Sequence, residues 1–212
     1  MRALVIYATC EGQTERIAMR IAEQLSGENI PTDTYNVTQL PADEIAIDAY
    51  DAVVLGSSLH YGQHDPRIAW IIATHRELLS DIPSALFSVS LATLGEQAKE
   101  RSEEDWVAGE FLRELRYDPP LRASFAGALR YSRYGWLKRH MMHRLVAKVG
   151  HPTVMDHDYE YTDWPAVDRF ARRFARFVRS CEQPKPTQPL LTSASEPFNR
   201  YSTRRRDLSE RR

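Results

Sequence analysis

The chain opens with a short apolar run, a turn of small and hydroxyl-bearing residues, and an amphipathic segment. Residues 3–7 are apolar and partly β-branched, and they have the length of a buried strand. Ile17, Ile21 and Leu25 then recur every four residues, which is the spacing of one helical face. A strand, a turn and a helix N-terminus in this order bring backbone N–H groups and the positive end of the helix dipole together. The stretch therefore predicts an anion site that suits a phosphate.

The turn itself, residues 9–14, favours the phosphate of a flavin over a nucleoside triphosphate or a dinucleotide. A P-loop needs Gly-x-x-x-x-Gly-Lys-Ser/Thr, but no lysine lies in this turn, and a dinucleotide fingerprint needs three glycines where only Gly12 is present. Two hydroxyls, those of Thr9 and Thr14, and several amides remain to bind the phosphate. The alternative is an ordinary strand-to-helix turn in which Thr14 caps the helix.

Apolar strand-like runs and helical periodicities alternate along the chain. The expected strands are residues 3–7, 31–37, 52–56, 85–91 and 124–129, and the expected helices are 15–25, 66–79, 102–115, 135–149 and 164–178. Residues 40–47 read as a short helix or irregular connection between two of the strands, and the helix over 135–149 is an extra one. Alternation of this kind predicts an α/β fold with a doubly wound parallel sheet.

Three loops are expected at the carboxyl edge of that sheet, where open α/β sheets bind their ligands. The first would hold the phosphate, and the other two would line a flavin ring, with Tyr61 able to stack and Gly62 allowing close backbone approach. The candidate residues are Thr9, Cys10, Glu11, Gly12, Gln13 and Thr14, then Ser57, Ser58, Leu59, His60, Tyr61 and Gly62, and finally Ser90, Leu91 and Ala92. For each loop alone, the alternative is simple turn chemistry. Together they predict an FMN site.

No acid–base pair or nucleophile stands out, so the sequence predicts no catalytic side chain. His60 and His64 lie beside the expected ring. They either relay protons or are exposed loop histidines.

Five segments occur in the order found in one known family. They read YATCEGQTERIA at 7–18, SLHYG at 58–62, PSALFSVSL at 83–91, AGALRYSRY at 126–134 and YTDW at 161–164. Over about residues 1–180 the chain resembles the flavodoxin-like, quinone-dependent protoporphyrinogen IX dehydrogenase family, and the fourth segment is far more specific than the phosphate loop. That family usually carries basic residues where Cys10 and His60 stand.

The resemblance implies a flavodoxin-like sheet of order 2-1-3-4-5, with FMN at its carboxyl edge and a long insertion after the fifth strand. It implies oxidation of protoporphyrinogen IX to protoporphyrin IX in haem synthesis, with electrons passed through FMN to a membrane quinone (menaquinone or ubiquinone). The alternatives are an electron-carrying flavodoxin and an FMN-dependent quinone reductase. Carriers of that kind are usually strongly acidic around the flavin, whereas the net charge here is −1.

The segment of residues 136–149, which begins at Trp136 and ends at Val149, mixes aromatic, Met and basic side chains. The basic residues between positions 129 and 149 are Arg130, Arg133, Lys138, Arg139, Arg144 and Lys148, with no acidic residue among them. This composition is typical of a helix at a membrane interface. The alternative is a helix packed on its own domain or at a dimer interface.

Bulk properties set the remaining expectations. A net charge of −1 gives no signal for nucleic acid, and two cysteines suit a reducing compartment. No leader precedes the first strand, and no apolar run approaches about 18 residues, so we expect a cytoplasmic protein held peripherally at the inner face of the cell membrane. We expect one domain over residues 1–181, with its insertion at about 130–158, and a disordered basic tail over 182–212.

Overall fold

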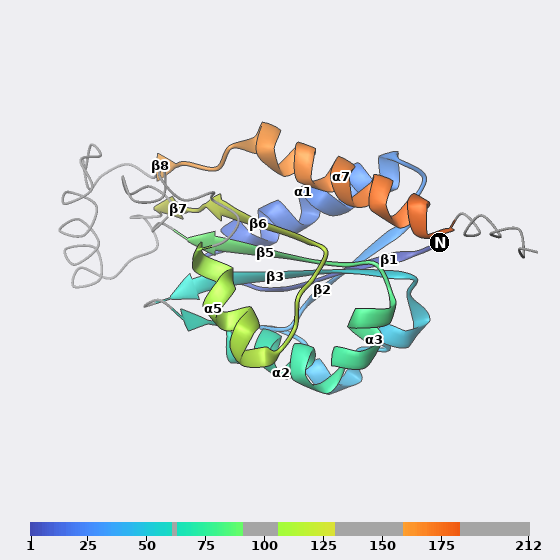
Figure 1. Cartoon of the computed structure of the whole chain (residues 1–212). Helices are drawn as coiled ribbons and strands as arrows, with labels where there is room; N and C mark the ends of the chain where they lie inside the picture. The colour runs from blue at the N-terminus through green and yellow to red at the C-terminus, as the bar shows by residue number, and fades with distance from the viewer. Residues whose placement is uncertain (61–62, 91–105, 130–158, 183–212) are drawn as a thin grey trace, which may run out of the picture.

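A parallel sheet forms the centre of the molecule (Figure 1). The structure, a computed structural model, describes residues 1–60, 63–90, 106–129 and 159–182. The parallel strands are, in spatial order, β2 (Thr32–Asn36), β1 (Ala3–Ala8), β3 (Ala52–His60), β5 (Ser84–Ser90) and β6 (Leu121–Ala126). This is the expected 2-1-3-4-5 order, and the flavodoxin-like prediction is confirmed.

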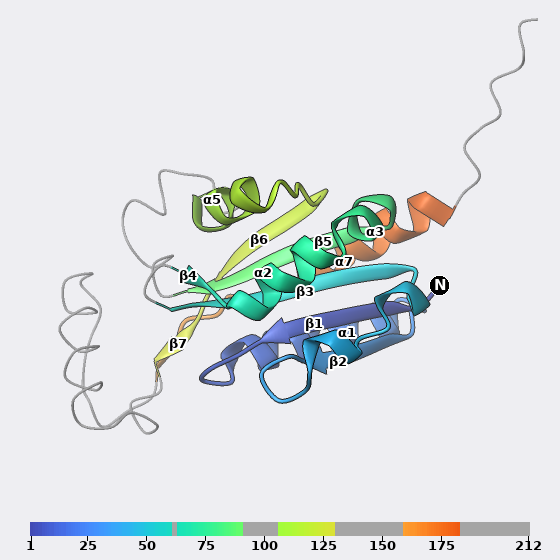
Figure 2. The same cartoon turned by 90° about the horizontal axis from the view of Figure 1, so that it is seen from below.

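Helices cover both faces of the sheet. On one face lie α1 (Gln13–Gly27) and α7 (Trp164–Glu182), and on the other α2 (Pro66–Thr74), α3 (Arg76–Asp81) and α5 (Trp106–Leu115), which stand in front of the sheet in Figure 2. Two single 3₁₀ turns, η1 (Ala42–Glu44) and η2 (Ile47–Ala49), connect β2 to β3. β1 is buried along its whole length because both of its faces are covered, which explains its unbroken apolar sequence.

The core on the α1 and α7 side is built around an aromatic cluster. The ring of Phe87 on β5 lies 6.0 Å from that of Phe125 on β6 and 6.5 Å from that of Phe170 on α7 (centroid to centroid). Gly56 on the neighbouring strand β3 leaves the room that the Phe87 ring occupies, since a Cβ there would lie 2.2 Å from Phe87 Cζ.

The helix expected over residues 66–79 and the fifth strand differ from the sequence prediction. Residues 66–79 form two helices, broken at His75, for which the structure offers no local physical reason. The fifth strand begins earlier, at Leu121, and leaves the sheet at Gly127, whose amide donates to the Ser90 carbonyl. Beyond that glycine, β7 (Ala128–Leu129) pairs antiparallel with β8 (Tyr159–Glu160). The segment between them, with the helix expected at 135–149, and the tail over 183–212 lie outside the described residues.

Ion pairs hold α7 against α1. Arg20 forms a bidentate contact with Asp168, with Nε–Oδ1 at 2.7 Å and Nη2–Oδ2 at 3.0 Å. Near the other end of the same helix pair, Arg179 binds Glu28. The hydrogen bonds from Arg20 hold the pKa of Asp168 below its ordinary value, and those from Arg179 do the same for the pKa of Glu28.

We expect the thermal stability of the protein to fall as the pH drops below about 4, because the unfolded chain binds protons more readily than these carboxylates do in the folded state. A carboxyl with a lowered folded pKa contributes stability above its unfolded pKa and loses it as the pH falls through the folded value. The variant Asp168→Asn should therefore melt at a lower temperature than the wild type at pH 7, but its melting temperature should fall less when the pH is lowered. Differential scanning calorimetry between pH 7 and 3 measures this. An equal acid-induced loss in both proteins would contradict the assignment.

Candidate functional site

The turn between β1 and α1 is closed by its own residues. The Gly12 amide donates to Thr9 Oγ1 at 3.0 Å, and Gly12 takes the left-handed conformation, with φ at 86°. The helix begins at Gln13, so Gly12 is the N-cap. The alternative in which Thr14 caps the helix is wrong, because Thr14 lies inside the first turn and is buried. The first-turn amides have no acceptor within the helix, which is the arrangement that binds anions.

Tyr7, at the end of β1, ties the strand to this first turn. Its hydroxyl donates to Glu15 Oε1 at 3.1 Å. Burial, together with the negative charge of Glu15, raises the pKa of Tyr7 to about 12, so the hydroxyl stays protonated at neutral pH. The contact directs the Glu15 carboxylate to Tyr7.

The second predicted loop is largely strand. The sequence places a loop over residues 57–62, but Ser57, Ser58, Leu59 and His60 continue β3. The strand is prolonged because the short antiparallel strand β4 (Gln63–His64) pairs with its end, so the end of the apolar run does not mark the end of the strand. Tyr61 and Gly62 lie outside the described residues.

The third predicted loop starts where expected. Ser90 is the buried last residue of β5, whereas Leu91 and Ala92 lie outside the described residues. Because β1, β3 and β5 are neighbours in register, Ala8 lies beside Ser57 and Ser57 beside Ser88. The structure thus brings the described parts of all three candidate loops to one edge.

Two buried hydroxyls lie near this edge of the sheet. Ser58 Oγ on β3 and Ser88 Oγ on β5 are buried, and neither has a hydrogen-bond partner within the described part of the chain. Unpaired buried hydroxyls are uncommon in folded proteins. The strand register places them on opposite faces of the sheet, Ser58 on the side of α1 and Ser88 on the side of α2 and α5. Ser58 is therefore the hydroxyl that shares a face with the glycine-capped turn, and together they fit a phosphate and the polar edge of a flat ring.

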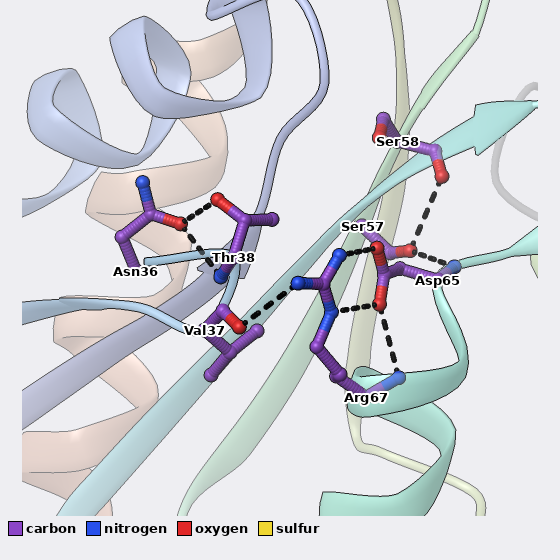
Figure 3. Close-up of polar contacts among 7 residues, drawn as sticks. All are labelled: Asn36, Val37, Thr38, Ser57, Ser58, Asp65 and Arg67. Carbon is purple, nitrogen blue, oxygen red and sulfur yellow. Dashed lines mark hydrogen bonds and ion pairs between the residues drawn. The ribbon is translucent and has the colours of Figure 1, made fainter. Parts of the chain in front are cut away.

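An Asp–Arg pair that the sequence analysis missed braces the same edge (Figure 3). The side chain of Asp65 caps α2 by accepting a hydrogen bond from the Arg67 amide. The same carboxylate accepts two hydrogen bonds from the Arg67 guanidinium, at 2.7 and 2.8 Å. The backbone amide of Asp65 donates to Ser57 Oγ at 3.1 Å. Arg67 Nη1 also donates to the carbonyl of Val37, which follows β2. The pair thus links β2, β3 and α2. The sequence does carry a signal for the role of Asp65, because Asp followed by Pro, here Pro66, is a helix-start signature.

The comparisons with known proteins agree with this fold. A family model described as a flavodoxin domain matches residues 4–156. The rubredoxin oxygen:oxidoreductase of Desulfovibrio gigas superposes with a TM-score of 0.52 at 16% identity, covering 84% of this chain and 36% of that one. The Flv1 flavodiiron core of Synechocystis gives 0.50 at 15% identity, covering 85% of this chain and 36% of that one. These likenesses show the fold. The protein is a flavodoxin-domain protein, and that class of domain implies a flavin cofactor.

Relatives in sequence define the class further. The protoporphyrinogen IX dehydrogenase [quinone] of Escherichia coli (strain K12) is 34% identical over 178 residues, which is 84% of this chain and 97% of that protein. The protein of the same name from Leishmania major is 33% identical over 197 residues, which is 92% of this chain and 82% of that one. The chain belongs to the family of quinone-dependent protoporphyrinogen IX dehydrogenases, which are oxidoreductases.

Proposed function

We propose that the protein binds FMN and oxidises protoporphyrinogen IX to protoporphyrin IX, passing the electrons to a membrane quinone as a step of haem synthesis. The observation that carries the proposal is the 34% identity to a dehydrogenase of that name along 97% of its length. The structure adds a turn suited to one phosphate. The reaction removes six electrons and six protons from the substrate, and three quinones take them up as quinols.

The roles within the site follow from the placement of its residues. Residues 9–14 would bind the phosphate through backbone amides and hydroxyls, because no lysine or arginine lies among them. The ends of β3 and β5 would line the ring, with Ser58 Oγ able to donate a hydrogen bond to it. Flavin, when bound, supplies two-electron oxidation, and the protein supplies orientation and polarity. We assign no catalytic side chain.

The decisive experiment mixes the purified yellow protein with protoporphyrinogen IX without oxygen. The flavin absorbance near 450 nm should bleach, porphyrin fluorescence should appear, and a water-soluble quinone should restore the yellow colour. A protein that protoporphyrinogen leaves oxidised but that a nicotinamide reduces would be a quinone reductase. One that exchanges only single electrons with protein partners would be a flavodoxin-type carrier.

The identity of the flavin has its own test. One phosphate site and the absence of a dinucleotide fingerprint from the sequence predict that heat-released cofactor runs as FMN on chromatography. FAD in the supernatant would overturn this part of the proposal.

We propose that the protein works at the inner face of the cell membrane through residues 136–149, which lie outside the described part of the chain. None of the described helices has the length and apolarity needed to cross a bilayer. Each basic residue near an anionic leaflet contributes about 1 kcal/mol at moderate salt, so several together hold a domain reversibly.

Replacing Lys138, Arg139, Arg144 and Lys148 by Gln should weaken binding to phosphatidylserine vesicles by about 100-fold or more, by the same reasoning. Turnover of a lipid-tailed quinone should slow, while turnover of a water-soluble one stays unchanged. The matched control replaces the same number of basic residues by Gln, namely Arg169, Arg172, Arg173 and Arg176, which are exposed on α7. If the control variant loses as much vesicle binding as the test variant, or neither loses any, residues 136–149 are not the contact.

A further inference from the structure

The side chain of Gln13, the first residue of α1, is buried and binds β8 and the segment that follows it. Its Nε2 donates to Thr162 Oγ1 at 2.9 Å and to Glu160 Oε1 at 3.2 Å. Its Oε1 accepts from Arg16 Nη1 at 3.2 Å. Only 4% of the residue is exposed, so these partners fix the position of the helix start.

Glu160 is the centre of this network. Its Oε2 accepts from Arg16 Nη1 at 2.6 Å, and its Oε1 accepts from the indole Nε1 of Trp164 at 2.8 Å. The Arg16 guanidinium carbon lies 5.2 Å from the centroid of the Trp164 ring, over its face. Burial alone favours the neutral acid, but hydrogen bonds from Arg16 and Gln13 outweigh it and hold the pKa of Glu160 below its ordinary value. One carboxylate therefore joins β8, the first turn of α1 and the start of α7.

The segment that carries Glu160 is itself anchored to the ligand edge of the sheet. Glu160 pairs with Ala128 in the short β7–β8 ladder. Two residues on, Thr162 Oγ1 donates to the carbonyl of Ala126, the last residue of β6, at 2.7 Å. Figure 1 shows β7 and β8 together at this end of the sheet, with α1 and α7 side by side. The anchor for the α1 first turn is thus the sheet edge.

We propose that Glu160 is a positioning residue for the cofactor phosphate, an inference that rests on the proposed FMN site. The phosphate turn, residues 9–14, has no basic side chain, and Arg16, one residue beyond the first-turn amides, is engaged by Glu160. Binding then depends on where the backbone amides point, and the strength of a hydrogen bond falls steeply with misalignment. By holding Gln13 and Arg16, Glu160 sets the direction of those amides.

The test compares two flavins that differ only in the phosphate. Flavin is removed from the full-length protein, and FMN and riboflavin are titrated separately, with quenching of flavin fluorescence as the readout. Glu160→Ala should lower the affinity for FMN about tenfold. It should change the affinity for riboflavin by less than about twofold, since riboflavin has no phosphate to misalign. Glu160→Gln keeps an acceptor but loses the charge, so its FMN affinity should lie between that of the wild type and that of Glu160→Ala.

A matched control separates positioning from general stability. Asp168→Asn breaks the Arg20–Asp168 pair, which also joins α1 to α7 but lies one helical turn beyond Arg16. It should lower the melting temperature by an amount similar to Glu160→Ala and leave the ratio of FMN to riboflavin affinity unchanged.

Three results would overturn the inference. The first is an equal fall in FMN and riboflavin affinity in Glu160→Ala. The second is a fall in FMN affinity in Asp168→Asn as large as that in Glu160→Ala. The third is tighter FMN binding in Glu160→Gln, which would show that the carboxylate repels the phosphate. A wild-type chain that binds neither flavin would instead overturn the proposed function, and the inference with it.

Discussion

Replacing Gly12 by valine is expected to remove most of the flavin from the purified protein. Gly12 has a φ of 86°, and a left-handed conformation costs an L-residue about 1–2 kcal/mol, more for a β-branched one. The chain would relieve this strain by opening the turn that the Gly12–Thr9 hydrogen bond closes. An effect of about 1.4 kcal/mol on binding is tenfold in affinity, so the Kd for FMN should rise by about that factor or more. Flavin occupancy, read from the ratio of absorbance at 450 and 280 nm, should then fall when the protein is diluted and washed free of unbound flavin.

The matched control is Gly27→Val at the opposite end of α1. A Cβ at Gly27 meets no atom within 4 Å, and Gly27 lies outside the left-handed region. This variant should purify with wild-type flavin content. Full occupancy in Gly12→Val would show that the turn does not hold the cofactor, and equal losses in both variants would point to a general weakening of α1.

Replacing Gly56 by alanine is expected to be among the most destabilising single-methyl changes in the described sheet. The new Cβ would lie 2.2 Å from Phe87 Cζ and 2.5 Å from Cε1, and Phe87 is fully buried among Phe125 and Phe170. The ring has no free space to move into, because protein cores are close-packed. Overpacking of this kind costs about 1–3 kcal/mol, and we expect the upper end here. For a chain of this size the melting temperature should fall by roughly 5–10 °C.

Gly109→Ala provides the control with the opposite sign. Gly109 lies within α5, and a Cβ there meets no atom within 4 Å. Alanine in place of glycine inside a helix should stabilise the protein by about 0.5–1 kcal/mol. Thermal unfolding of the two variants side by side measures both effects. If Gly56→Ala melts at the wild-type temperature, the core around Phe87 has room that the structure does not show.

Gly56 and Gly12 illustrate why a glycine in the sequence has no single meaning. Gly12 follows the carboxyl end of β1, whereas Gly56 lies in the middle of β3. Gly12 is required for its backbone conformation, whereas Gly56 is required for the space that a neighbouring aromatic ring fills. The first requirement is visible in a strand-to-helix turn. The second depends on which residue of another strand lies opposite.

The sequence by itself determined the order of the main strands and helices, the doubly wound sheet and the glycine-bearing turn between β1 and α1. Each depends on local information: apolar runs of strand length, side chains recurring every four residues, and a glycine between a strand and a helix. The final helix, predicted over 164–178, was found at Trp164–Glu182 for the same reason.

Only the tertiary structure decided which polar residues meet at the site. β3 runs on to His60 because β4 pairs with it, and the chain leaves the sheet at Gly127 because β7 has β8 as its partner. Gln13 and Glu160 are 147 positions apart, and Arg67 meets Val37 from 30 positions away. No local periodicity encodes such contacts. They exist because the carboxyl ends of all parallel strands lie at the same edge of the sheet. That edge brings polar side chains from distant parts of the sequence within hydrogen-bonding distance.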